Sequence, residues 1–273
     1  MRIPKTHFSV VIPFFNEQHY LGRTLQSWAD QDRLPETMIL VNNACTDQSW
    51  EIALKFQEDY RSKMEIILLT ELRPGKIFAL EKAQQHLKGE WAVFCDADTW
   101  YPAHYLSLVE RLAQNSRETV VSIMALDLPD IPECRDSRFK IWFKQVASVL
   151  FHNKCHTGGF GQCFKISALK KCGGFDSKKW GFVLMDHEIM FRLLQWGRSV
   201  YHKDLWCIPS QRRGSRIRVR WNTWEQILYF VHPFPMGNWF FYRYLRSKFL
   251  QRKLAHRNLR QQPWTVAPVS EAS

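Results

Sequence analysis

Short apolar segments alternate with segments of helical periodicity through the first half of the chain. The apolar segments, which we expect to be strands, cover residues 8–12, 38–41, 65–69, 91–95 and 119–125. Between them, apolar side chains recur three or four positions apart, as at Leu21, Leu25 and Trp28, and this spacing is typical of amphipathic helices. Strands separated by helices predict βαβ units, so the expected fold class is α/β with a mostly parallel sheet.

The second half of the chain is less regular. Two prolines in residues 128–134 predict a loop, and the apolar positions from Phe139 to Leu150 predict an amphipathic helix. Another helix is expected from Met185 to Trp196, because Gly197 then ends the periodic pattern. The glycine-rich turn at 158–161 follows no clear strand and lacks the full Gly-x-Gly-x-x-Gly spacing, so it does not indicate a dinucleotide site.

Polar clusters follow three of the expected strands. Asp96-Ala97-Asp98 comes directly after strand 91–95, while residues 13–17 and 42–47 follow the first and second strands. Each cluster alone would also fit a turn or a helix cap. Ligands of open α/β sheets bind at the carboxyl ends of the strands, so we expect the three clusters to meet. Two carboxylates there would suit Mg²⁺ or Mn²⁺ shared with a substrate phosphate.

Composition indicates a folded protein with its charge concentrated at one end. Of the 273 residues, 45% are hydrophobic and 14% are aromatic, which excludes a disordered chain. The formal net charge is +12, and the segment from Ser210 onward holds 12 Lys or Arg and two acidic residues. The basic character therefore belongs mainly to the C-terminal segment and indicates an anionic partner for it.

The same sequence features favour a cytoplasmic location. No apolar run reaches the ~18 residues that cross a bilayer, and the N-terminus lacks the apolar core of a signal peptide. The seven cysteines are odd in number, irregularly spaced and without a Cys-x-x-Cys pair. This pattern favours small reduced thiols over disulfides or a zinc site at Cys155, His156 and Cys163.

The ordered motifs make residues 6–213 resemble the family 2 glycosyltransferases, which have the GT-A fold of the nucleotide-diphospho-sugar transferase superfamily. The resemblance is carried by Phe8-Ser-Val-Val-Ile-Pro-Phe-Phe-Asn-Glu17, Val41-Asn-Asn-Ala-Cys-Thr-Asp47, Pro74-Gly75-Lys76 and Asp96-Ala-Asp98. It implies a Rossmann-like, mostly parallel sheet flanked by helices in residues 1–213, followed by a helical, basic and aromatic extension at 214–273. It also implies transfer of a sugar from a nucleoside diphosphate sugar to an acceptor hydroxyl.

The resemblance implies a donor site after the first two strands. Pro13, Asn16 and Glu17 would belong to the nucleotide-contacting turn. Asn43 stands where the family commonly has an acidic residue that reads the base, and an amide can also donate to and accept from a base edge. Lys76 would add a point charge or a base contact, or would be an ordinary solvated lysine at a helix start.

The resemblance also implies groups for the diphosphate. Asp98 would hold Mg²⁺ or Mn²⁺, with Asp96 beside it on the metal or the ribose, so that the charge of the departing nucleotide is neutralised. Arg212 and Arg213 resemble the family's late basic motif, which can fold over the diphosphate; alternatively they start the basic tail. Gly214 replaces the Arg of the full Gln-x-x-Arg-Trp form, which argues against a processive polymer synthase.

A general base is implied at the helix that begins near residue 185. Asp186 aligns with the family residue that removes the acceptor proton, and Glu188 is a reserve candidate. Met185 replaces a Glu that most members have before it. Acids in the first turn of a helix can also serve only the helix dipole. Inversion at the anomeric carbon is implied by the family alone.

The segment 214–260 mixes arginines and lysines with many aromatic residues. This mixture suits a helix at a membrane interface, and we expect peripheral binding at the cytoplasmic membrane face, near a lipid-linked or cell-surface glycan acceptor. A packed pair of C-terminal helices and a dimer contact are the alternatives. From Gln261 onward the sequence predicts a disordered end.

Three other functions would each explain part of the sequence. A nucleic-acid-binding protein would explain the positive charge, but it would not explain acids at three strand ends, so no nucleic-acid partner is expected. A nucleotidyltransferase would need a glycine-rich basic loop after the first strand, where Phe14 to Glu17 stand. A catalytically inactive homologue that binds nucleotide sugars stays open because of Asn43 and Met185.

Overall fold

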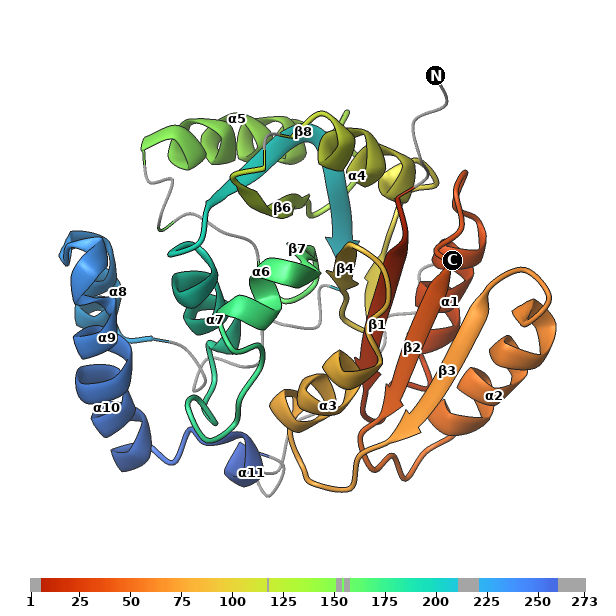
Figure 1. Ribbon diagram of the computed structural model, residues 1–273, viewed down its shortest axis with the longest axis horizontal. Coiled ribbons are helices and arrows are strands. Elements are labelled where there is room, and N and C mark those ends of the chain that lie inside the picture. Colours follow the sequence, from red (N-terminus) through yellow and green to blue (C-terminus); the bar gives the residue numbers. More distant parts are fainter. Residues whose placement is uncertain (1–5, 117, 151–153, 155–157, 211–220, 260–273) are drawn as a thin grey trace.

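Eight strands form one sheet in the part of the chain that the structure describes. The computed structural model describes residues 6–116, 118–150, 154, 158–210 and 221–259 (Figure 1). The order across the sheet is β3-β2-β1-β4-β7-β6-β8-β5. The strands are β1 (Phe8–Phe14), β2 (Thr37–Asn42), β3 (Glu65–Thr70), β4 (Trp91–Phe94), β5 (Thr99–Trp100), β6 (Val120–Asp127), β7 (Gln162–Lys165) and β8 (Arg198–Pro209).

The first half has the predicted βαβ organisation. Strand β1 pairs in parallel with β2 and β4, and β2 pairs in parallel with β3. The connecting helices are α1 (Leu21–Ala29), α2 (Ser49–Tyr60) and α3 (Lys76–Ala83), the last followed by the short 3₁₀ helix η1 (Gln84–His86), and α4 (Tyr105–Gln114) leads to β6. All five strands predicted from the apolar segments are confirmed, within one or two residues at most of their ends.

The sheet is mixed because β7 enters it between β4 and β6. Strand β7 is antiparallel to both neighbours, whereas β8 is parallel to β6, and the short β5 is antiparallel to β8. The sequence pattern did not predict β7 as a separate strand, since its four residues follow the glycine-rich turn at 158–161 directly. The predicted loop at 128–134 is confirmed, with α5 (Arg135–Leu150) beginning after it.

The core lies on both faces of the sheet because successive side chains of a strand point to opposite faces. Val10 and Ile12 pack with α1, α2 and α4 in one buried cluster. Val11 packs on the other face, in a cluster that includes α3, α6 (Ile166–Lys171) and α7 (Met185–Leu193). Every residue of β1, β2 and β4 is buried, which explains why these strands read as uninterrupted apolar runs.

Helix α5 presents its apolar stripe to solvent. The sequence predicts this helix correctly, but Phe139, Trp142 and Phe143 are 67%, 60% and 56% exposed. Its contact with the fold runs through another side, where Ile141 packs against the cluster of Leu126, Leu128 and Trp206, and where Lys140 pairs with Asp127 at 2.6 Å. Periodicity finds a helix and its apolar face, but it does not say which face meets the protein.

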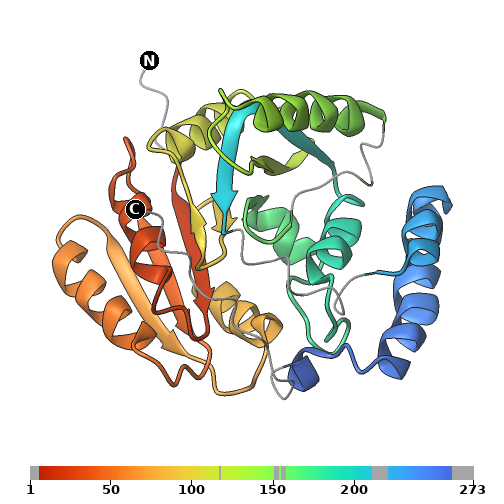
Figure 2. The same ribbon diagram turned by 180° about the vertical axis from the view of Figure 1, so that it is seen from behind.

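The C-terminal helices pack against the domain that precedes them. They are α8 (Thr223–Val231), η4 (Phe234–Met236), α9 (Gly237–Trp239), the π-helical turn η5 (Phe240–Leu245), α10 (Arg246–Gln251) and α11 (His256–Leu259). Helices α8 to α10 stack at the end of the molecule opposite β3 and α2, as both views show (Figure 2). Phe240, Phe241, Leu245 and Phe249 are buried in the same cluster as Trp180.

Backbone hydrogen bonds complete the docking of this segment. The amide of Val183 donates to the carbonyl of Leu254 at 3.2 Å. The amide of His256 donates to the carbonyl of Gly181 at 2.9 Å. The inner side of the extension is therefore a packed layer of helices, which was one of the alternatives left open by the sequence. Among the described residues, none of the helices combines the length and apolar composition that crossing a bilayer requires.

A matched pair of glycine substitutions tests this docking. A Cβ at Gly237 would lie 2.1 Å from Cε2 of the buried Phe191 ring, whereas one at Gly22 meets nothing nearer than 4.0 Å. We expect Gly237→Ala to lower the free energy of unfolding by roughly 1–3 kcal/mol through overpacking. Gly22→Ala, in the exposed face of α1, should raise it by about 0.5–1 kcal/mol. Urea unfolding measures both values, and a Gly237→Ala protein as stable as Gly22→Ala would contradict the docking.

Candidate active site

The ends of β1, β2 and β4 meet at one edge of the sheet. Phe14 at the end of β1 lies opposite Asn42 at the end of β2, and Val11 lies opposite Phe94 at the end of β4. The amide of Cys95 then donates to the carbonyl of Val11 at 2.9 Å. The three polar clusters expected from the sequence therefore leave the sheet side by side.

The turns after β1 and β2 are joined by side-chain hydrogen bonds. Pro13 is buried as part of β1, and Asn16 follows with a left-handed backbone, φ 52°. The Asn16 carboxamide oxygen accepts from the amide of Thr46 at 2.9 Å, and its nitrogen donates to the Thr46 hydroxyl at 3.1 Å. The amide of Glu17 donates to the hydroxyl of Ser49 at 2.7 Å. These bonds fix the shape of the turn that the sequence assigns to the nucleotide.

Asn43 braces a neighbouring loop through its side chain. Its amide nitrogen donates to the carbonyls of Glu71 and Arg73 at 2.9 and 2.8 Å, and its oxygen accepts from the amide of Gly75 at 3.1 Å. The residue is 2% exposed. This corrects the expectation that Asn43 reads a base edge directly, because both of its donor hydrogens are already used inside the protein. It positions the loop at 71–75 instead.

That loop carries two charged residues that the sequence analysis did not single out. Arg73 donates to both carboxylate oxygens of Glu71, at 3.0 and 2.8 Å, and its guanidinium lies 4.7 Å from the ring centroid of Phe78. These bonds from Arg73 hold the pKa of Glu71 below its usual range. Glu71 directly follows β3, so the strand-end argument applied to the third strand would have found it.

Lys76 and Asp96 form an ion pair in the middle of the site. Lys76 is the first residue of α3, and Gly75 before it has φ 135°, a conformation that favours glycine. Its ammonium group contacts Oδ1 of Asp96, and both side chains are mostly buried. The structure thus places Lys76 at the predicted acidic cluster, where it neutralises one of the two carboxylates.

Asp98 is tied to the end of β8. The hydroxyl of Ser210 donates to Oδ2 of Asp98 at 2.7 Å, and the amide of Ser210 donates to the Asp98 carbonyl at 2.9 Å. The expected residues Arg212 and Arg213 lie outside the described residues, two and three positions after Ser210. Within the described part of the chain, no group of three His, Cys, Asp or Glu could hold a metal. Two carboxylates nevertheless fit Mg²⁺ or Mn²⁺, which commonly bind one or two of them together with substrate phosphates.

The turn at 158–161 faces both acidic positions. A Cβ at Gly159 would lie 2.7 Å from Nζ of Lys76 and 3.9 Å from Oδ1 of Asp96. A Cβ at the adjacent Gly158 would lie 3.4 Å from Oδ2 of Asp186. Because neighbouring Cα atoms are about 3.8 Å apart, Asp96 and Asp186 border the same short segment. The two glycines place no side chain of their own between these carboxylates, while the ring of Phe160 lies 2.7 Å from the Cβ position of Gly158.

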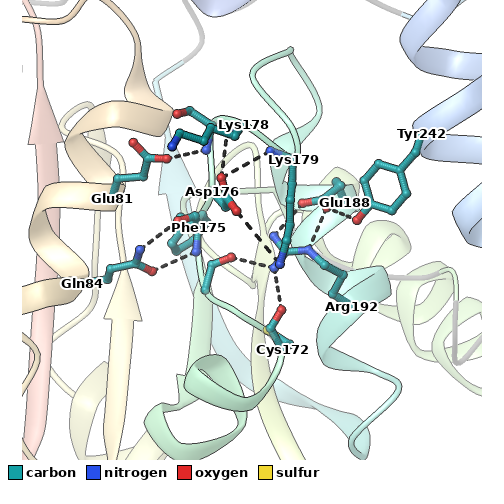
Figure 3. A network of polar contacts seen from close by, with 12 residues as sticks. Glu81, Gln84, Cys172, Phe175, Asp176, Lys178, Lys179, Glu188, Arg192 and Tyr242 are labelled. Carbon is teal, nitrogen blue, oxygen red and sulfur yellow. Dashed lines mark hydrogen bonds and ion pairs between the residues drawn. The ribbon is translucent and has the colours of Figure 1, made fainter.

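The helix that carries Asp186 separates the two candidate bases. Asp186 lies in the first turn of α7, after Leu184 with φ 61°, and is partly exposed. Glu188 is 2% exposed and bonds to Arg192 at 2.7 and 2.9 Å. It also accepts from the hydroxyl of Tyr242 at 2.5 Å (Figure 3). The structure therefore corrects Glu188 from a reserve base to a buried, paired residue that joins α7 to the C-terminal helices.

Comparisons with known proteins place this site in a family. The profile described as "Glycosyl transferase family 2" matches residues 9–173. The chain belongs to glycosyltransferase family 2. In this family 2 chain, Asp96-Ala97-Asp98, the start of α3 and the turn at 158–161 all fall inside the matched part, whereas Asp186 and Ser210 follow it.

Curated relatives of this family 2 chain match over limited lengths. The poly(ribitol-phosphate) beta-N-acetylglucosaminyltransferase TarS of Staphylococcus aureus is 30% identical over 96 residues, which are 34% of this chain. Glycosyltransferase GlyA of Streptococcus pneumoniae is 26% identical over 115 residues, or 41% of this chain. The matched part spans 16% of the length of each of these two relatives.

Solved structures of similar shape establish the GT-A glycosyltransferase fold. Mannosyltransferase PcManGT from Pyrobaculum calidifontis, in complex with GDP-Man and Mn²⁺, aligns with a TM-score of 0.64 at 24% identity, over 78% of this chain and 60% of that one. S. aureus TarS 1–349, in complex with UDP-GlcNAc, aligns with a TM-score of 0.57 at 16% identity, over 89% and 73% of the two chains. The expected mostly parallel sheet with a helical C-terminal segment is thereby confirmed.

Substitution of one glycine tests the shape of the site. The added methyl group of Gly159→Ala would displace the Lys76 ammonium group from its ion pair with Asp96, so we expect affinity for UDP or GDP with Mn²⁺ to fall about tenfold. Calorimetric titration measures the affinity, with Gly22→Ala as the control that adds the same methyl group elsewhere. Equal affinities of the two variants would show that the turn does not border the nucleotide.

Proposed function

We propose that this family 2 chain transfers a sugar from a nucleoside diphosphate sugar to an acceptor hydroxyl, with inversion at the anomeric carbon and with Mg²⁺ or Mn²⁺. The observation that carries the proposal is the meeting of Lys76, Asp96 and Asp186 around Gly158 and Gly159. One side of this space has groups suited to a diphosphate, and the other has a carboxylate suited to an alcohol. Two neighbours of the same fold were solved with GDP-Man and with UDP-GlcNAc, which supports the donor class.

In this proposal the strand ends bind the donor. Pro13, Asn16 and Glu17 shape the turn against which the nucleoside lies, and Asn43 acts through the loop at 71–75 that it braces. Lys76 supplies a positive charge near the diphosphate. Arg212 and Arg213 are proposed to clamp phosphate oxygens, since Ser210 fixes the start of their segment next to Asp98.

A divalent cation fits the acidic motif of this site. Asp98 would hold it, with Asp96 beside it, and their oxygen atoms are the ligands that Mg²⁺ and Mn²⁺ prefer. When bound, the cation would neutralise charge on the diphosphate. The Mn²⁺ in the complex of the similar mannosyltransferase supports this choice of cofactor.

Asp186 is proposed as the general base. Its carboxylate would take the proton of the acceptor hydroxyl while that oxygen bonds to the anomeric carbon and the bond from this carbon to the diphosphate oxygen breaks. Attack opposite the leaving group inverts the configuration. Glu188 cannot share this task because Arg192 and Tyr242 occupy its oxygens inside the protein.

Two substitutions separate donor binding from chemistry. Asp98→Ala should abolish metal-dependent binding of the nucleoside diphosphate, since it removes the proposed ligand. Asp186→Asn should leave donor binding unchanged and reduce transfer or donor hydrolysis by about 10²–10⁴-fold, the range typical of a lost general base. A panel of nucleoside diphosphate sugars, assayed with Mn²⁺ and Mg²⁺, measures both effects.

Asp59→Asn is the control because Asp59 is exposed near the C-terminal end of α2 and belongs to none of the polar clusters of the site. Normal turnover by Asp186→Asn would make the assignment of the base wrong. Metal-dependent binding of nucleotide sugars, without transfer or hydrolysis of any of them, would instead identify an inactive homologue. Steeply salt-dependent binding to nucleic acid, without nucleotide-sugar binding, would favour the alternative nucleic-acid function.

We also propose peripheral contact with the cytoplasmic face of a membrane through residues 214–260, near a lipid-linked or cell-surface glycan acceptor. The division into a catalytic domain at 1–213 and an extension at 214–273 belongs to this proposal. Helix α8 exposes an apolar stripe on which Trp224 and Val231 are 74% and 73% exposed, with Ile227 and Phe230 between them. A stripe of this kind suits the headgroup region of a bilayer.

Charge on the same segment supports an anionic lipid surface. Residues 221–259 contain one acidic residue, Glu225, which is buried and pairs with Arg252 at 2.5 Å. Arg243, Arg246 and Lys248 are exposed on the neighbouring turns. Each such cation near an anionic membrane contributes about 1 kcal/mol to binding.

Flotation with vesicles containing phosphatidylglycerol tests this contact. Because the exposed apolar side chains of α8 would enter the headgroup region, Trp224→Ser with Val231→Ser should lower the partition coefficient about tenfold or more. Phe139→Ser with Trp142→Ser removes a comparable stripe from α5 and is the control. A wild-type protein that stays in solution contradicts the proposal, and a loss confined to the α5 variant would move the contact away from the extension.

A further inference from the structure

A cavity lies beside α7, where the C-terminal helices meet the domain. Its volume is about 560 Å³. Five of its ten lining residues are cationic, namely Lys171, Lys178, Lys179, Arg192 and Arg246, and none is acidic. Surface clusters of cations repel one another unless acids or bound anions compensate them. The charges around this cavity therefore decide what it can hold.

Acids compensate only part of this positive charge. Glu188 accepts two hydrogen bonds from the guanidinium group of Arg192. Oδ2 of Asp176 lies 4.0 Å from the ammonium group of Lys179 (Figure 3). Within the described residues, Lys171, Lys178 and Arg246 make no ion pair. Two carboxylates thus face five cations, which leaves a net positive charge at the mouth of the cavity.

The loop that carries the two lysines is held in place from both sides. Gln84 after α3 donates to the carbonyl of Phe175 and accepts from its amide, both at 2.8 Å. Asp176 accepts from the amides of Lys178 and Lys179 at 2.9 and 3.3 Å. Figure 3 shows the bonds of Gln84, the first residue of η1, to this loop, with Arg192 on the other side of the loop. The cations are therefore presented by a braced backbone.

The opposite wall comes from the extension. Asn238, Tyr242 and Arg246 line it, so the cavity exists only because the C-terminal helices dock on α7. Trp196 adds a half-exposed aromatic face, and the ammonium group of Lys171 lies 5.7 Å from its ring centroid. The Asn238 amide and the Trp196 indole are further donor groups of this wall, whereas the Tyr242 hydroxyl already donates to Glu188.

The cavity is separate from the proposed sugar-transfer site. Arg192 is six residues after Asp186 on α7, which is about 9 Å along the helix and about 120° around its axis. Gly158 and Gly159, which form the turn next to Asp186, do not line the cavity. A ligand here would thus be an additional one, independent of the nucleotide.

We propose that this cavity binds a phosphate group. Arginine and lysine side chains around one opening, with aromatic walls and no lining acid, match the charge and hydrogen-bonding needs of a phosphate dianion or a phosphodiester. The group belongs either to a free phosphorylated small molecule or to the headgroup of an anionic phospholipid, because the wall that carries Arg246 is part of the basic extension. Both sources present the same phosphate chemistry, and vesicle binding distinguishes them.

Calorimetric titration with inorganic phosphate and with glycerol phosphate tests the site. Both lysines are exposed, so Lys178→Gln with Lys179→Gln should fold normally. It should weaken phosphate binding about tenfold or more by removing two charged donors. Lys55→Gln with Lys203→Gln makes the same change in net charge at exposed positions elsewhere and should bind as the wild type does. Arg246→Gln gives a second variant from the opposite wall and should weaken binding as well.

Vesicle binding identifies the source of the phosphate. If the lysine variant also loses binding to phosphatidate vesicles, relative to the control variant, the ligand is a headgroup; if only soluble phosphate binding is lost, it is a free phosphorylated molecule. Equal phosphate affinity in the lysine variant, the control and the wild type overturns the site. Titration of UDP with Mn²⁺ in the same proteins reports the donor site, so failure there concerns the sugar-transfer proposal alone.

Discussion

Parallel pairing of β1 with β2 and β4 is the constraint on which the rest of this molecule depends. Strands β1 and β2 end opposite each other at Phe14 and Asn42, and β4 ends opposite Val11, so the three strands release their loops at the same edge of the sheet. All three strands are buried on both faces, and a slip by one residue would exchange the side chains of the two cores. The sheet therefore fixes where Asp96, Asn16 and Asn43 can lie before any ligand is present. Hydrogen bonds between the loops then refine their shapes.

Charge at this edge is balanced by short-range pairs. Lys76 neutralises the charge of Asp96, and Arg73 neutralises that of Glu71. The hydroxyl of Ser210 donates a hydrogen bond to the carboxylate of Asp98. Such pairs keep a cluster of carboxylates stable in the absence of a cation, and the Lys76 pair also brings α3 to the acidic motif. The glycines at 158 and 159 complete the arrangement, since any side chain there would fill the space between Asp96 and Asp186.

The C-terminal extension is part of the same packing as α7. Glu188 joins Arg192 and Tyr242, and the aromatic rings of the extension share a core cluster with Trp180. The helix of the proposed base thus has one side toward the sheet and another toward the extension. This arrangement links the proposed sugar-transfer site, the cation-lined cavity and the basic outer surface through one helix, while leaving each with its own set of residues.

The sequence by itself determined the fold class, the five strands of the apolar segments and the residues that gather at their ends, because buried parallel strands leave continuous apolar runs and strand ends leave polar clusters. It did not determine β7, the outward face of α5 or the partners of Asn43 and Glu188. Only the tertiary structure decided these, since β7, Gln-Cys-Phe-Lys, has polar residues at both ends and forms no apolar run, and a side chain's role depends on which distant backbone or charge lies beside it. The difference is physical: periodicity records local burial, whereas hydrogen bonds between segments far apart in the chain leave no pattern in the sequence.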